Sequence, residues 1–158
     1  LVGSEMCIRD RSEAPQKLEQ VADRSILKIY SFDKDNPLDF SWLVKAVLND
    51  LQKGVPCSEI ASAFHRTYAA MWCVELAKQA VRQKLSRVVL CGGVFQNKLL
   101  VDILMPMLRQ LGLQPYLPAS VPCNDAGIAV GQMAVTAAWI EQSMNHNDKR
   151  HARVVVGL

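Results

Sequence analysis

The spacing of apolar residues predicts a strand and two helices in the first half of the chain. Residues 25–32 mix apolar side chains with single polar ones and predict a strand. Apolar positions after Asp39 recur at helical offsets as far as Gly54, so we expect a helix there with Asp39 as its cap. A second helical run begins at Ser58, its expected cap, and reaches about Lys84. This second helix should be long and buried along one side.

The second half of the chain has the pattern of an α/β unit. Residues 87–91 form a short apolar run, typical of a strand buried on both faces of a parallel sheet. A helix is expected after Asn97, with Gly112 as its stop. A second strand follows at 113–117, and a helix rich in small residues begins at Asp125. This order predicts parallel strands joined by a right-handed crossover.

Both ends of the chain are expected to lie outside this unit. Residues 1–12 show neither period, and 5–12 look like translated adapter sequence, with a flexible native terminus as the alternative. We therefore assign residues 1–24 to a non-core segment whose native origin is left open. Residues 25–143 form the domain, and 144–158 form a tail.

Composition narrows the class of protein. The chain has 158 residues, 50% hydrophobic and 21% charged, which fits one soluble domain too small for a complete two-domain enzyme. The net charge of +3 is modest, so no nucleic acid is expected as a partner. No apolar run is long enough to span a membrane. The 5 cysteines are widely spaced without a CxxC pair, which favours a reducing, cytoplasmic setting.

The strongest candidate for chemistry is the loop after residues 87–91, which contains Gly92 and Gly93. Ligands of α/β folds bind at the carboxyl ends of parallel strands, and glycines let the backbone approach a flat or charged ligand closely. The helix that begins near Asn97 adds unpaired N–H groups, which favour an anion or a ribose. The loop therefore points to a nucleotide, with a simple tight turn as the alternative.

Asp125 stands at the equivalent position after the second strand. A carboxylate there can cap the following helix or hold a divalent metal that bridges phosphates, and both interpretations stay open. Adjacent parallel strands would bring Asp125 and the Gly92 loop together. This convergence favours a functional site.

Three further residues could carry chemistry, but a structural role is favoured for each. His65 could be a metal ligand or a base, yet no second ligand stands at suitable spacing, so a packed or surface histidine is expected. Cys91 and Cys123 could be nucleophiles, but no histidine is near either in sequence. Buried cysteines acting as small apolar residues are expected instead.

Two segments, GGVFQNKLL at 92–100 and PCNDAGIAVGQ at 122–132, resemble the C-terminal end of hydrogenase-maturation carbamoyltransferases of the HypF family. The resemblance covers roughly residues 25–142, and it departs at Ala126, where the family has glycine. Supporting matches are DFSW at 39–42 and AFHR at 63–66.

The resemblance implies an α/β fold of the acetate and sugar kinase, chaperone and actin type, with this chain in its C-terminal lobe. It also implies an enzyme that uses ATP and carbamoyl phosphate. Through a carbamoyl-adenylate, the family carbamoylates the C-terminal cysteine of the partner HypE, and the product becomes the cyanide ligand of nickel–iron hydrogenase. The attacking thiolate belongs to the partner, so no catalytic residue is assigned in this chain.

The resemblance carries site residues over position by position. Gly92 and Gly93 match the adenine-contacting turn of the family, and Asn97 matches its nucleotide-binding asparagine. Asp125 matches the aspartate that binds a divalent metal, whose identity is left open. The remaining metal ligands, a histidine pair of the preceding lobe, have no counterpart here.

Two alternatives stay open. Related enzymes that transfer threonylcarbamoyl to tRNA adenosine have small residues in place of Phe95 and Gln96, and Thr in place of Asn124. The chain could also be a non-catalytic module that binds a nucleotide or docks a partner. As the end of a longer enzyme, it is expected to be inactive alone.

Overall fold

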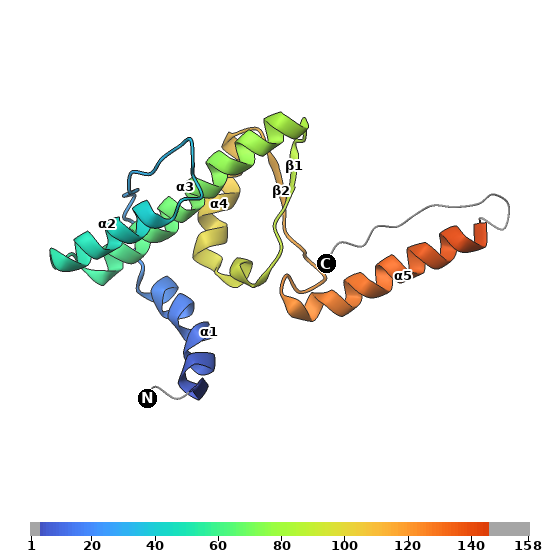
Figure 1. Cartoon of the computed structure of the whole chain (residues 1–158), viewed down its shortest axis with the longest axis horizontal. Helices are drawn as coiled ribbons and strands as arrows, with labels where there is room; N and C mark the ends of the chain where they lie inside the picture. The colour runs from blue at the N-terminus through green and yellow to red at the C-terminus, as the bar shows by residue number, and fades with distance from the viewer. Residues whose placement is uncertain (1–3, 146–158) are drawn as a thin grey trace.

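The computed structural model describes the backbone of residues 4–145 and the side chains of residues 13–142, and Figure 1 shows the arrangement. A long helix runs through the arrangement, and a short parallel sheet lies to one side near its C-terminal end (Figure 1). In chain order the elements are α1 (Ser4–Val21), α2 (Ser41–Gln52), α3 (Cys57–Gln83), β1 (Arg87–Val89), the 3-10 turn η1 (Gly93–Gln96), α4 (Lys98–Gln110), β2 (Gln114–Tyr116), the 3-10 turn η2 (Asp125–Gly127) and α5 (Ile128–Asn145).

Helix α3 is the element on which α1, α2 and α4 pack. Its length is as predicted, but the prediction of burial along one side is wrong, because the consecutive residues 60–63 are all buried and core packs on both sides of the helix. Thr67 and Met71 are fully buried. The predicted cap is wrong, because Pro56 precedes the helix and Ser58 lies inside its first turn. The Ser58 carbonyl instead accepts a hydrogen bond from the Ser62 hydroxyl at 2.8 Å.

Strands β1 and β2 pair in parallel, as predicted, with Val88 opposite Pro115. The prediction that β1 is buried on both faces is wrong, since Val89 is 69% exposed. Arg87, which lies on the same face of the strand as Val89, is exposed as well. One face of β1 therefore remains open to solvent.

The core has two parts, one on each side of α3. The first joins α3 to α4 and to the two strands, through Ala69, Cys73, Leu90, Leu99, Leu100, Ile103, Leu104, Leu108 and Leu113. The second joins α3 to α2 and to the segment before it, through Tyr30, Leu43, Ala63 and Met71. Helical offsets on α4 predicted most of its buried positions, because one stripe of that helix faces the core.

Residues 25–32 do not form the predicted strand. The segment is extended, but side chains of α3 take its backbone hydrogen bonds. The Tyr30 N–H donates to the Thr67 hydroxyl at 2.9 Å, and the Ile26 carbonyl accepts from Arg66 Nε at 2.6 Å. No strand lies beside the segment in residues 4–145, so its apolar pattern reflects burial against a helix.

The hydrophobic pattern did not predict α1. Its described side chains nevertheless reach the core, because the Glu19 carboxylate accepts the Leu99 N–H at 3.0 Å. Just after the helix, Ala22 packs against the cluster between α3 and α4. The segment before residue 25 thus contacts the domain at these points.

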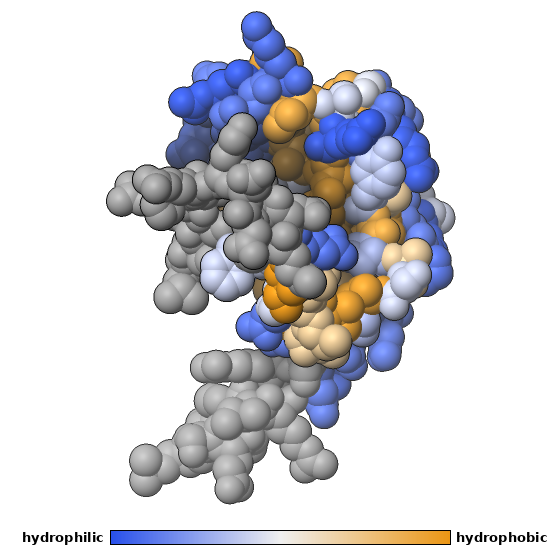
Figure 2. All heavy atoms as spheres, turned by 90° about the vertical axis from the view of Figure 1, so that its right-hand side faces the viewer, coloured by the Kyte–Doolittle hydropathy of each residue, from blue (hydrophilic) through white to orange (hydrophobic). Residues whose placement is uncertain are grey.

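Helix α5 contacts η2 and projects away from the other helices (Figure 1). Its large apolar side chains are exposed, namely Ile128, Val130, Met133, Val135, Trp139 and Ile140. Figure 2 shows the molecule from the right-hand side of Figure 1. In this view, hydrophobic residues form a band between hydrophilic surfaces. Within residues 4–145, no helix is both long and apolar enough for a membrane crossing.

Candidate functional site

The glycine loop begins where β1 ends. The Leu90 N–H donates to the Tyr116 carbonyl at 2.8 Å, which extends the strand pairing by one residue. Gly92 then adopts φ 108° and ψ 158°, a backbone conformation that is almost confined to glycine. An added Cβ would meet nothing within 4 Å at either Gly92 or Gly93. The backbone conformation at position 92 therefore requires glycine. At position 93, the space that a side chain would fill is open.

The two candidate loops meet, as the parallel strands predicted. The Gly92 N–H donates to the Cys123 carbonyl at 2.6 Å, joining the glycine loop to the loop before Asp125. Asn124 caps η2, since its Oδ1 accepts the Ala126 N–H at 3.1 Å. The capping role considered for Asp125 therefore belongs to its neighbour, and the Asp125 side chain is exposed.

Gly127 is a structural requirement that the sequence analysis did not single out. A Cβ at this position would overlap the Pro122 carbonyl oxygen and lie 3.1 Å from Val121 Cγ1. Only glycine lets η2 pack this closely against the preceding loop. The signal was present in the sequence as a glycine two residues after Asp125, but the pattern could not show what it approaches.

Asn97 is the N-cap of α4. Its Oδ1 accepts the Leu100 N–H at 2.8 Å, and its Nδ2 lies 2.9 Å from His65 Nε2. His65 is only 4% exposed, and its Nδ1 lies 2.7 Å from the Ala61 carbonyl oxygen. The prediction of a packed histidine is confirmed, but its contact with Asn97 was not foreseen.

Asp125 alone does not make a complete metal site in the described part of the chain. No group of three or more His, Cys, Asp or Glu side chains that could hold a metal lies within the described residues. Magnesium and calcium take about six or more oxygen ligands, of which Asp125 offers one carboxylate.

The two cysteines near the loops are not buried as predicted. Cys91 is exposed and Cys123 is half-buried. The buried thiol is Cys73 on α3, and burial raises its pKa to about 11. A thiol with so high a pKa is a poor nucleophile at neutral pH, because the thiolate is the reactive form.

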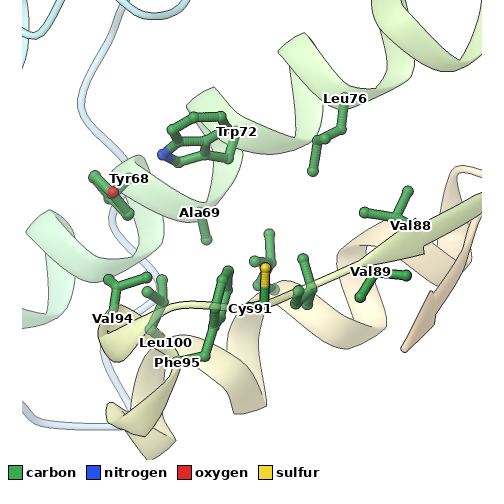
Figure 3. A pocket seen from close by; sticks show the side chains of 12 residues that line it. Tyr68, Ala69, Trp72, Leu76, Val88, Val89, Cys91, Val94, Phe95 and Leu100 are labelled. Atoms are coloured by element: carbon green, nitrogen blue, oxygen red, sulfur yellow. The ribbon is translucent and has the colours of Figure 1, made fainter. Parts of the chain in front are cut away.

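A cavity of about 290 Å³ opens beside the glycine loop, between α3 and β1. Tyr68 and Trp72 come from α3, whereas Cys91 and Phe95 come from the loop on the opposite side (Figure 3). Leu76 and Val88 extend the apolar wall away from the loop. Such a lining suits a flat, uncharged ring and excludes phosphate groups.

Residues 6–132 match the sequence profile of the family described as carbamoyltransferase, Kae1-like domain, second subdomain. Together with the parallel strands and the joined loops, this match defines the class: the C-terminal lobe of a Kae1-like α/β fold, of the acetate and sugar kinase, chaperone and actin type. The chain belongs to the HypF carbamoyltransferase family.

The chain is also similar to curated proteins of greater length. The chain is 39% identical over 101 residues to carbamoyltransferase HypF of Rhizobium leguminosarum bv. viciae, covering 63% of this chain and 13% of that protein. It is 34% identical over 110 residues to a HypF homolog of Cupriavidus necator, covering 68% of this chain and 28% of the relative. A bifunctional tRNA threonylcarbamoyladenosine biosynthesis protein of Methanobrevibacter smithii is 28% identical over 103 residues, covering 65% of this chain and 19% of its own length.

Two solved structures are also similar to this chain. A full-length HypF in a phosphate- and nucleotide-bound form superimposes with a TM-score of 0.67 at 29% identity, covering 73% of this chain and 19% of that one. HypF of T. kodakarensis, at 23% identity, has the same fold with a TM-score of 0.64 and covers 80% of this chain and 17% of its own. This chain therefore spans less than a third of each of these relatives.

Proposed function

We propose that this chain forms one wall of the nucleotide site in a HypF-type carbamoyltransferase. The longer protein would use ATP and carbamoyl phosphate, through a carbamoyl-adenylate, to carbamoylate the C-terminal cysteine of a HypE-like partner. That product would lead to the cyanide ligand of nickel–iron hydrogenase. The observation that carries the proposal is the hydrogen bond from the Gly92 N–H to the Cys123 carbonyl, because it joins the two loops that match the family.

Each part of the loop suits a part of a nucleotide. The backbone at Gly92 and Gly93 is open, with nothing within 4 Å of an added Cβ, so a flat ring can approach it closely. The apolar cavity beside the loop offers room for such a ring. The N-terminus of α4, capped by Asn97, presents a positive end of a helix dipole toward polar or anionic groups.

In this proposal Asp125 contributes one carboxylate to a divalent metal whose other ligands come from outside this chain. The nucleophile is the partner's thiolate, and the role of this chain is to hold the adenylate in position for attack. Cys57, Cys73, Cys91 and Cys123 are free thiols in the described part of the chain, which supports a cytoplasmic setting.

The similarity to archaeal threonylcarbamoyladenosine proteins supports a second candidate, transfer of threonylcarbamoyl to tRNA. The two candidates differ in the acceptor, a protein thiol or a tRNA adenosine. The modest net charge of +3 favours the protein acceptor, since tRNA binding depends on basic side chains that contact phosphates. A module without catalysis remains the third outcome.

A chimera tests the proposal. Residues 25–142 would replace the matching segment of the Rhizobium leguminosarum HypF, and carbamoyl transfer would be assayed with a HypE partner and with tRNA as acceptors. We expect transfer to the HypE thiol, and its loss in Asn97→Ala and Asp125→Ala. Asn49→Ala and Asp35→Ala are matched controls on exposed positions and should retain activity. Retained activity in the Asn97 and Asp125 variants would show that these residues do not form the site.

A further inference from the structure

His65 is a buried residue of α3, and it contacts the candidate site through one side chain, that of Asn97. Its Nε2 lies 2.9 Å from Asn97 Nδ2, and its Nδ1 lies 2.7 Å from the Ala61 carbonyl oxygen. The ring is 4% exposed. Both ring nitrogens therefore have partners within the protein, and no water is needed to satisfy either of them.

The chemistry of these partners fixes the tautomer of the ring. The Ala61 carbonyl can only accept a hydrogen bond, so Nδ1 must carry the proton and donate. Nε2 of the neutral ring is then an acceptor. The partner atom on Asn97 must be the amide nitrogen, because Oδ1 already accepts the Leu100 N–H at 2.8 Å. The three bonds agree with one another in only this arrangement.

We propose that His65 is a positioning residue that fixes the side-chain amide of Asn97 for the nucleotide, an inference that rests on the proposed function. With His65 and Leu100 engaged, the amide retains one N–H and one lone pair for a ligand. The amide cannot turn over, since a flip would place Nδ2 against the Leu100 N–H and Oδ1 against the bare Nε2. A donor would then face a donor, and an acceptor would face an acceptor.

If the role of His65 were purely structural, substitutions at this position would have different effects. If His65 only fills space and satisfies Ala61, then a leucine of similar size would weaken packing without affecting the amide of Asn97. If it positions Asn97, an acceptor at the place of Nε2 should be sufficient. The terminal amide oxygen of glutamine is such an acceptor, so His65→Gln should retain the function that His65→Leu loses.

Nitrogen NMR on the 158-residue chain tests the geometry directly. We expect the His65 ring to be neutral, with Nδ1 protonated and Nε2 bare. The Asn97 side-chain amide should give one well-dispersed pair of signals, shifted in His65→Leu and restored in His65→Gln. A protonated Nε2, or Asn97 signals that ignore both substitutions, would overturn the proposal.

ATP titrations of the same variants test the consequence. One hydrogen bond changes an equilibrium by about 3- to 10-fold, so His65→Leu should weaken ATP binding by roughly that factor. His65→Gln should stay within about 2-fold of the unmodified chain, and His65→Leu should add no further loss to Asn97→Ala, because coupled residues are not additive. Full additivity would contradict the positioning role.

The NMR signals and the ATP titrations together distinguish a failure of the His65 inference from a failure of the proposed function. Absence of ATP binding in the unmodified, folded chain would count against the proposed function for this chain, while the Asn97 amide signals would still decide the His65 inference. Binding that is indifferent to His65→Leu would overturn the inference and leave the proposed function standing. Circular dichroism of each variant identifies any that fails to fold.

Discussion

The side-chain nitrogen of Asn97 lies 2.9 Å from His65 Nε2, so the cap of α4 is anchored to a buried residue of α3. The same asparagine accepts the Leu100 N–H at 2.8 Å. Asn97 thus connects the start of α4, which follows the glycine loop, to the buried side chain of His65 on α3. Substitutions of Asn97 should therefore change stability as well as ligand binding.

Asn97→Ala should lower the free energy of unfolding by about 1–2 kcal/mol, because it removes the cap and leaves His65 without a donor. Urea denaturation of the variant and of Asn49→Ala gives the comparison. Asn49 lies on the exposed side of α2, so its substitution should change stability by less than about 0.5 kcal/mol. Equal losses in the two variants would argue against the cap.

Two adjacent glycines should respond differently to alanine. Gly92 has φ 108°, so Gly92→Ala should destabilise the fold by about 1–3 kcal/mol through backbone strain. Gly93 has open space and an ordinary φ, so Gly93→Ala should change stability by less than about 0.5 kcal/mol. Thermal unfolding separates the two effects. Both variants should bind ATP less well, because each adds a methyl group at the proposed contact surface.

Gly127→Ala should destabilise the fold by about 1–3 kcal/mol, because the new methyl group overlaps the Pro122 carbonyl. Gly131 is the matched control, since it lies in α5 with nothing within 4 Å of an added Cβ. Gly131→Ala should increase helicity, with a gain of roughly 0.5–1 kcal/mol. Chemical denaturation with circular dichroism measures both. A loss at Gly131 equal to that at Gly127 would mean that the loop is packed differently.

The hydroxyl of Tyr30 should lose its proton only at high pH. Burial, with a hydrogen bond from its hydroxyl to the Asp50 carboxylate, raises its pKa from 10.0 to about 12. A raised pKa in the folded state means that this stabilisation is present below pH 10 and is lost between pH 10 and 12. Ultraviolet titration of tyrosinate should show a late step, absent in Tyr30→Phe. A titration curve that Tyr30→Phe leaves unchanged above pH 10 would contradict this environment.

The predictable parts of the fold were those that depend on local pattern. The period of α4 follows from one buried stripe on that helix, and the parallel pairing follows from the strand, helix, strand order. That pairing also sufficed to bring the Gly92 loop to the loop that precedes Asp125, as the bond to the Cys123 carbonyl confirms.

The parts that could not be predicted depend on partners far along the chain. Residues 25–32 have the composition of a strand, but Arg66 and Thr67 take their backbone hydrogen bonds. His65 seemed isolated because its partner, Asn97, is 32 positions away. Exposure of Cys91 depends on which parts of the chain pack over the end of β1, which no local pattern encodes.

The central claim is that the loop from Gly92 to Asn97 binds a nucleotide, and an ATP titration followed by backbone amide NMR tests it most directly. The account predicts saturable shifts at Gly92, Gly93 and Asn97. Gly54, in the turn between α2 and α3, should not move and serves as the internal reference. Shifts that are absent at the loop up to saturating ATP, or that are equally large at Gly54, would contradict the claim.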